Sequence, residues 1–141
     1  MTKLKIEFDH TWHHHPLTVI GQLNNEQLFV DETGEKHSVE YDVDLADGDH
    51  EFSLTIKNKT NNNVLQEEGE TVKDSYISIQ RIIVDNIDLQ RIMLLNAKFS
   101  PDHPDPKAPV LEKLTELGYN GQYKFQFTTP LYLWVLEKLN E

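Results

Sequence analysis

The stretch HEFSLTIK, residues 50–57, decides the fold, because apolar and polar side chains alternate along it without a break. Its even-numbered residues, from His50 to Ile56, fall on one face. Its odd-numbered residues, from Glu51 to Lys57, fall on the other. Side chains of a β-strand point alternately to opposite faces, so this pattern predicts an antiparallel strand with one buried and one solvent-exposed face.

The same alternation recurs along the chain and predicts further strands. The residues that share a face are Leu4, Ile6 and Phe8; Val39, Tyr41, Val43 and Leu45; Ile77, Ile79 and Arg81; and Tyr123, Phe125 and Phe127. Turn residues separate these segments, and Asp47-Gly48 in ADGD is a strong hairpin signal. Together they predict an all-β protein, an antiparallel β-sandwich of the jelly-roll type that forms a single domain over residues 1–141.

Four other segments depart from this strand pattern. The polar, Asn-rich stretch 57–70 predicts a long exposed loop, and VDNIDL, residues 84–89, predicts a turn that leads into a further strand. The spacing of apolar residues over 110–118 predicts a short helix that ends at Gly118. A second C-terminal helix is expected after Thr129 as N-cap and Pro130 as first helical residue, with Trp134 in the core. The sandwich is therefore expected to carry one or two short helices near its C-terminus.

Composition excludes several classes of partner and site. The chain of 141 residues has a net charge of -11, and its thirteen basic residues are scattered, which disfavours nucleic acid as a partner. It has no cysteine, which excludes disulfides and thiolate chemistry. The N-terminus lacks the apolar region of a signal peptide, and no apolar run approaches the ~20 residues of a membrane span. We therefore expect a protein made in the cytoplasm, with no membrane partner.

The stretch HTWHHHP, residues 10–16, concentrates four of the seven histidines around Trp12. On a strand, His13 and His15 would point to the same face and could share a zinc, copper or nickel ion, but no motif supplies the remaining ligands. The alternative is that the histidines are the polar rim of a strand end. If Trp12 is exposed beside His13 and His15, these three residues are a contact point for a sugar or a partner chain.

Carboxylates gather in one segment but form no recognisable motif. Asp42, Asp44, Asp47 and Asp49 are oxygen donors of the kind that Ca²⁺ binds, yet the EF-hand pattern is absent and a solvated strand face is the simpler interpretation. No phosphate-binding loop, serine elbow or nucleotide fingerprint occurs. The sequence therefore predicts a protein that is not an enzyme. A metal-dependent or carboxylate enzyme would require a concave pocket with converging acids or histidines.

The central block, DGDHEFSLTIKNKT followed by VKDSYISIQRIIVDNIDL, resembles the calcium-dependent xylan-binding modules and their relatives. Gly48, His50 and Asn58 match the first half of the family pattern, and Asp74 heads the strand of the second half. ETVKDS stands where the family has a loop of the Gly-Gly-Asp-Arg type. The resemblance implies a carbohydrate-binding module with calcium as an optional cofactor, held in part by Asp74.

The chain as a whole, ending in NGQYKFQFTTPLYLWVLEKL, also resembles small proteins of tailed marine bacteriophages. This resemblance implies a virion component, such as a decoration, neck, tail or baseplate protein. The leading hypothesis from sequence is thus a non-enzymatic virion structural or adaptor protein, needing no cofactor and binding other virion proteins or copies of itself. The alternative is a carbohydrate-binding module with a glycan as partner.

Overall fold

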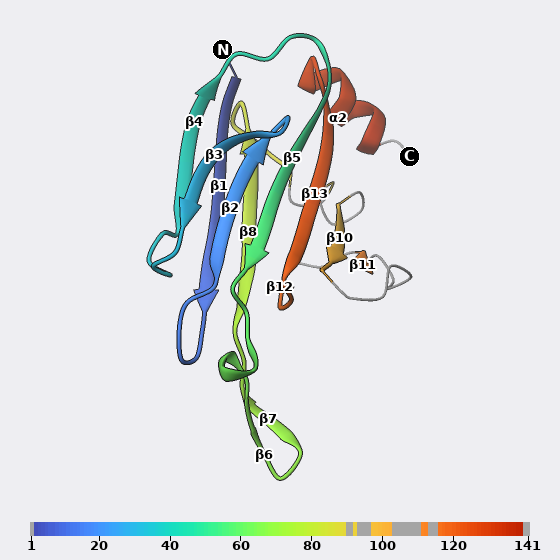
Figure 1. The fold of residues 1–141 in the computed structure, drawn as a ribbon. Helices are drawn as coiled ribbons and strands as arrows, with labels where there is room; N and C mark the ends of the chain where they lie inside the picture. Colours follow the sequence, from blue (N-terminus) through green and yellow to red (C-terminus); the bar gives the residue numbers. More distant parts are fainter. Residues whose placement is uncertain (1, 90–91, 93–96, 103–110, 113–115, 140–141) are drawn as a thin grey trace.

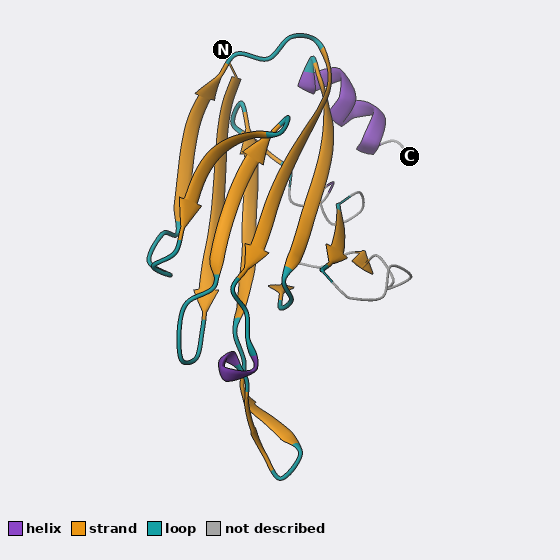
Figure 2. Ribbon diagram, viewed as in Figure 1, coloured by secondary structure: helices purple, strands orange, loops and turns teal. Residues whose placement is uncertain are grey.

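The computed structural model describes residues 2–89, 92, 97–102, 111–112 and 116–139, which form two antiparallel sheets packed face to face (Figures 1 and 2). The first sheet has the strand order β12 (Glu116–Leu117), β8 (Tyr76–Val84), β1 (Thr2–Thr11) and β4 (Ser38–Val43), and β9 (Ile87–Asp88) pairs with β8. The second has the order β11 (Leu111–Glu112), β10 (Lys98–Pro101), β13 (Gly121–Thr129), β5 (Gly48–Lys57), β2 (Thr18–Leu23) and β3 (Glu26–Asp31). The prediction of an all-β antiparallel sandwich is confirmed.

The core lies between the two sheets and is built from the alternating faces that the sequence predicts. In β1 the buried residues are Leu4, Ile6 and Phe8, and in β5 Phe52 and Ile56 are fully buried. The longest aromatic row comes from β13, where Tyr123, Phe125 and Phe127 are each at most 2% exposed. Burying one such side chain contributes about 1.5–3 kcal/mol to folding, so the facing apolar rows hold the sheets together.

A β-bulge in the first sheet changes the pattern expected for β8. The prediction that Arg81 shares a face with Ile77 and Ile79 is wrong: Ile77, Ile79, Ile82 and Val84 are buried, whereas Arg81 is exposed. The pairing of β1 with β8 shifts register between Glu7 and Phe8, which leaves an extra residue in β8. An extra residue shifts the period-two alternation by one position, and this returns Ile82 and Val84 to the core side.

The turn ADGD is a crossover and not the predicted hairpin. It leads from β4 in the first sheet to β5 in the second, as Figure 1 shows at the upper end of the sandwich. The Asp-Gly pair permits a change of direction in either case, and the sequence does not say which sheet receives the next strand. A true hairpin turn occurs at Asn24 and Asn25, with φ of 51° and 68°, between β2 and β3. Another occurs at Asp85 and Asn86, as expected.

Two further segments differ from the sequence predictions. Residues 57–70 are not a plain loop: they contain the short 3₁₀ helix η1 (Asn61–Asn63) and β6 (Leu65–Glu67), which pairs with β7 (Glu70–Lys73) in a hairpin that projects from the lower end of the sandwich (Figure 1). The helix predicted over 110–118 is also wrong in its described parts, which are the edge strands β11 and β12. Residues 110 and 113–115 lie outside the described residues.

The C-terminal helix α2 (Leu131–Leu139) is confirmed, and it packs beside β13 at the upper end of the sandwich (Figure 1). Trp134 is 8% exposed and meets the ring of Phe125 edge to face, with centroids 6.1 Å apart, so its expected place in the core is also confirmed. The helix begins at Leu131, so the prediction of Pro130 as its first residue is wrong by one position, and the Thr129 hydroxyl donates to the Ala46 carbonyl. Among the described residues, no helix is long and apolar enough to span a membrane.

A buried polar network closes the lower end of the sandwich. Asn63 and Ser75 are both fully buried. The Asn63 amide nitrogen donates to the carbonyls of His13 and His15 at 3.0 and 2.8 Å, and its oxygen accepts from the Thr60 N–H at 2.8 Å. The Ser75 hydroxyl donates to the Asn63 carbonyl at 3.0 Å and accepts from the His13 N–H at 2.8 Å. The turn between β1 and β2, which contains His13 to His15 and is called the histidine turn below, is thus held through its backbone groups.

Replacing Asn63 with Ala should lower the free energy of unfolding by about 2–3 kcal/mol, because buried backbone partners are left unsatisfied. Urea denaturation measures this value. The matched control is Asn62→Ala at an exposed neighbouring position, where we expect a change within about 0.5 kcal/mol. Equal effects of the two substitutions would contradict the role assigned to the network.

The environment of Asp31 indicates how the stability of the fold depends on pH in acid. Burial of this carboxylate raises its pKa, but hydrogen bonds from the Thr33 N–H and hydroxyl and from the Lys36 N–H, with the nearby His10 ring, outweigh burial and lower the pKa below its ordinary value of 3.8. A lowered pKa gives stability that is present above the ordinary value and is lost as pH falls through the folded value. Below pH 3.8, wild-type stability should therefore decline more steeply than that of Asp31→Asn. Denaturant titrations from pH 7 to pH 2 test this, and parallel pH profiles would contradict it.

Candidate functional site

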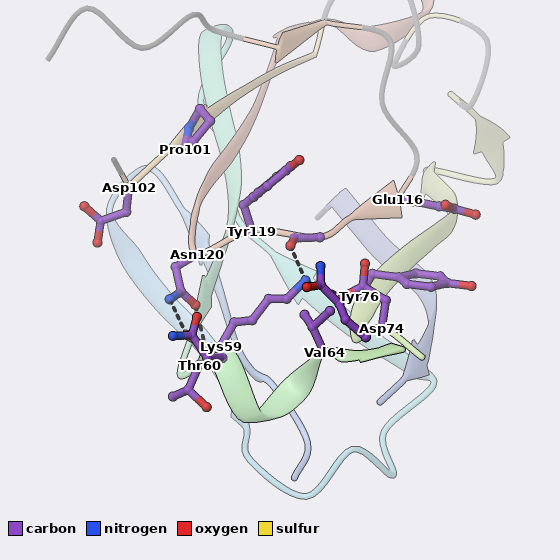
Figure 3. A pocket seen from close by; sticks show the side chains of 13 residues that line it. Lys59, Thr60, Val64, Asp74, Tyr76, Pro101, Asp102, Glu116, Tyr119 and Asn120 are labelled. Atoms are coloured by element: carbon purple, nitrogen blue, oxygen red, sulfur yellow. Dashed lines mark hydrogen bonds and ion pairs between the residues drawn. The ribbon is translucent and has the colours of Figure 1, made fainter. Parts of the chain in front are cut away.

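A pocket of about 750 Å³ lies at the lower end of the sandwich, where segments distant in sequence meet. It is bordered by the chain that follows β5, the start of β8, the end of β10 and the turn between β12 and β13. Its lining residues are Lys59, Thr60, Asn61, Val64, Gln66, Asp74, Tyr76, Pro101, Asp102, Glu116, Gly118, Tyr119 and Asn120 (Figure 3). The pocket therefore depends on both sheets, because strands of each sheet end at its border.

Lys59 lies at the centre of this pocket (Figure 3). Its ammonium nitrogen donates to Asp74 Oδ1 at 2.8 Å, to the Ser75 carbonyl at 2.9 Å, and to the Gly118 carbonyl. An ammonium group has three N–H donors, so these bonds use all of them. The side chain is only 13% exposed, and Nζ lies 5.9 Å from the centre of the Tyr119 ring.

Asn120 fixes the backbone on either side of the Lys59 α-carbon. Its side-chain oxygen accepts from the Lys59 N–H at 2.8 Å, and its side-chain nitrogen donates to the Lys59 carbonyl at 2.9 Å. The Asn120 carbonyl also accepts from the Asp102 N–H at 2.7 Å. One amide side chain thus joins the segment after β5 to the turn before β13, and its own backbone joins that turn to the end of β10.

Asp74 is ionised beside the ammonium. Its partial burial raises its pKa, but the hydrogen bond from Lys59, the hydrogen bond from the Ser75 N–H at 2.7 Å and the charge of Lys59 outweigh burial and lower the pKa. The carboxylate and the ammonium therefore face one another as a charged pair at neutral pH.

The pocket also presents aromatic and polar groups. Tyr119 is 59% exposed, and Tyr76 is partly buried. In Figure 3, Tyr119 and Asn120 lie on one side of the Lys59 ammonium and Asp74 and Tyr76 on the other. The polar side chains of Asn61, Gln66, Asp102 and Glu116 complete the lining. Such a surface can stack a flat apolar face and hydrogen-bond to hydroxyl groups at its edge.

The structure does not bring the sequence-predicted contact residues into this pocket. Trp12, His13 and His15 belong to the turn between β1 and β2 and are not among the lining residues. Trp12 is 47% exposed. Its indole nitrogen lies close to Gly34: a Cβ added to this glycine would be only 2.8 Å from that nitrogen. His15 Nε2 is bonded to the carbonyl of Asn58 at 2.7 Å. A contact role for these three residues stays a prediction.

Asp74 is the one predicted site residue that lies in the pocket, where Lys59 and Ser75 are its hydrogen-bond donors. A calcium-binding role for it also stays a prediction. Among the described residues, no group of three or more His, Cys, Asp or Glu side chains is placed to hold a metal ion. Sequence reasoning missed Lys59, Asn120 and the two tyrosines, although Asn120-Gly121 is a local turn signal beside Tyr119.

No protein-family model matches the sequence, and no curated protein matches it. Among solved structures, the chain is similar to a carbohydrate-binding module described as vCBM60 in complex with galactobiose. The TM-score is 0.57 at 10% sequence identity, and the match covers 87% of this chain and 96% of the module. At this identity the likeness is one of fold. The chain therefore has the β-sandwich fold of a carbohydrate-binding module.

Proposed function

We propose that this protein is a non-catalytic carbohydrate-binding module that binds a saccharide in the pocket around Lys59. The observation that carries the proposal is a pocket of about 750 Å³ that combines tyrosine rings with a polar rim. This volume lies in the range of about 300–1,000 Å³ that is usual for small-ligand sites. A fold shared with a galactobiose-bound module supports the same function.

The charge of the pocket indicates the class of saccharide. Its lining includes three carboxylates, those of Asp74, Asp102 and Glu116, and one ammonium, that of Lys59. All three donors of that ammonium are already used within the protein. Among the described lining residues, an anionic sugar would meet net negative charge with no available cation, and burying an unpaired charge is costly. A neutral saccharide, with hydroxyl groups for the polar rim and C–H faces for the tyrosines, fits best.

Tyr119→Ala should weaken the binding of a neutral disaccharide about tenfold, because the exposed ring provides a stacking surface. Isothermal titration calorimetry with galactobiose, and a glycan array of neutral and anionic oligosaccharides, measure this. Tyr132→Ala on α2 is the matched control, since Tyr132 is 67% exposed but lies outside the pocket. An array without any hit for the wild-type protein would contradict the proposed function.

A second candidate function, contact with copies of itself or with virion proteins, is favoured by one surface. Helix α2 exposes four large apolar or aromatic side chains, from 42% to 67% each: Tyr132, Leu133, Leu136 and Leu139. Clustered exposed apolar residues mark interaction surfaces. This helix lies at the opposite end of the sandwich from the pocket (Figure 1), so the two functions do not compete for one surface. Nothing in the comparisons bears on a virion origin, and the glycan-binding function is the better supported one.

The self-association form of this second function has a simple test. Light scattering coupled to size-exclusion chromatography should show a concentration-dependent rise in mass for the wild type. The double substitution of Leu133 and Leu136 by Asp should abolish this rise, because it places charge in the apolar contact. A wild-type protein that stays monomeric at the highest soluble concentration would rule out self-association through α2.

A further inference from the structure

The Lys59 ammonium is held by oxygen atoms from two segments that each lead directly into a pocket tyrosine. The Ser75 carbonyl precedes Tyr76, and the Gly118 carbonyl precedes Tyr119. Both carbonyls accept from the same nitrogen, so the two peptide units cannot move apart without losing a charge-assisted hydrogen bond. Lys59 therefore joins the two tyrosine segments immediately beyond the β12–β8 ladder, in which Leu117 pairs with Ile77.

The backbone of Lys59 is fixed independently of its ammonium. The Asn120 side chain bonds both its N–H and its carbonyl, and Asn58, immediately before it, has a φ of 71°. Left-handed backbone at Asn58 turns the chain at the end of β5. The Lys59 side chain thus leaves a constrained backbone and reaches a fixed set of oxygens.

A carboxylate and two carbonyls are the oxygen types that a hard cation such as calcium prefers. In this protein they converge on Lys59 Nζ, at 2.8 Å for Asp74 Oδ1 and 2.9 Å for the Ser75 carbonyl. A calcium ion would need several oxygens at about 2.3–2.6 Å and would lie next to a second positive charge. With Lys59 in place, these residues do not fit a calcium ion.

We propose that Lys59 is a built-in cation, a positioning residue whose ammonium assembles the pocket and makes saccharide binding independent of divalent cations. The part that concerns saccharides rests on the proposed function. The part that concerns pocket assembly does not, because it follows from the contacts of the ammonium alone.

Lys59→Met tests the proposal, because methionine keeps an unbranched side chain, one atom shorter than that of lysine, and removes the charge and the N–H donors. It leaves Asp74 without its charged partner, so we expect the melting temperature to fall by about 5–10 °C and galactobiose binding to weaken about tenfold. The matched control is Lys57→Met, an exposed lysine two residues away that does not line the pocket; it should change neither value. Equal melting temperatures of the two variants would overturn the proposal.

Chemical rescue distinguishes a cation site from ordinary packing. Lys59→Ala leaves space at the oxygens, and methylammonium should raise its melting temperature saturably, whereas tetramethylammonium, which has no N–H donor, should not. A merely structural side chain would show no such selectivity, and equal responses to the two ions would overturn the proposal.

Calcium tests the wild-type protein directly. Melting curves and galactobiose titrations in EDTA and in millimolar calcium should coincide. A saturable stabilisation by calcium, or saccharide binding only with calcium, would overturn the built-in cation while leaving the glycan-binding function intact. The opposite outcome is also informative: Lys59→Met is destabilised and chemical rescue succeeds, but no glycan binds to the wild type. This outcome would reject the proposed function and would support pocket assembly by Lys59.

Discussion

The burial of two apolar sheet faces against each other is the constraint on which the rest of this structure depends. A sheet cannot cover its own apolar face, so the two sheets must pack face to face. The buried side chains of these faces include Ile6 and Phe8 on β1, Phe52 on β5 and Phe125 on β13. That requirement sends the chain across from one sheet to the other at the ends of strands, as between β4 and β5 or β12 and β13. Crossovers leave backbone groups unpaired at each end of the sandwich, and polar side chains must satisfy them.

The lower end meets this need with fully buried Asn63 and Ser75 and with Lys59, which is 13% exposed. Asn63 and Ser75 hold the histidine turn, while Lys59 holds the segments that precede Tyr76 and Tyr119. Of these three residues Lys59 also lines the pocket, and Ser75 links it to the network, because the Ser75 carbonyl accepts from Lys59 while its hydroxyl donates to Asn63. Stability and the site are coupled there, whereas the α2 end is closed mainly by apolar contacts such as that of Trp134 with Phe125.

Local patterns explain why the strands could be predicted and the site could not. Alternation identified β1, β5 and β13 because a strand with one buried face repeats every two residues. The bulge in β8 shifts that alternation by one residue without a local signal. The composition of residues 57–70 predicts an exposed loop, because asparagine is usually exposed, and yet Asn63 is fully buried. The oxygens around Lys59 come from residues 15, 16 and 59 positions away, and two of them belong to the backbone. Backbone acceptors have no residue-type signature, so one sequence read alone cannot identify them.

The same reasoning explains how a chain with 10% identity can share the fold of a carbohydrate-binding module. A sandwich needs apolar residues at alternating positions, and many sequences meet that requirement. A binding site needs particular side chains at particular places, and a single lysine can change what the site requires. The sequence resemblance predicts a metal contact for Asp74, whereas in this structure the Lys59 ammonium donates to its Oδ1 at 2.8 Å. The likeness therefore extends to the fold alone, and the chemistry of the pocket has to be argued from Lys59 and its oxygens.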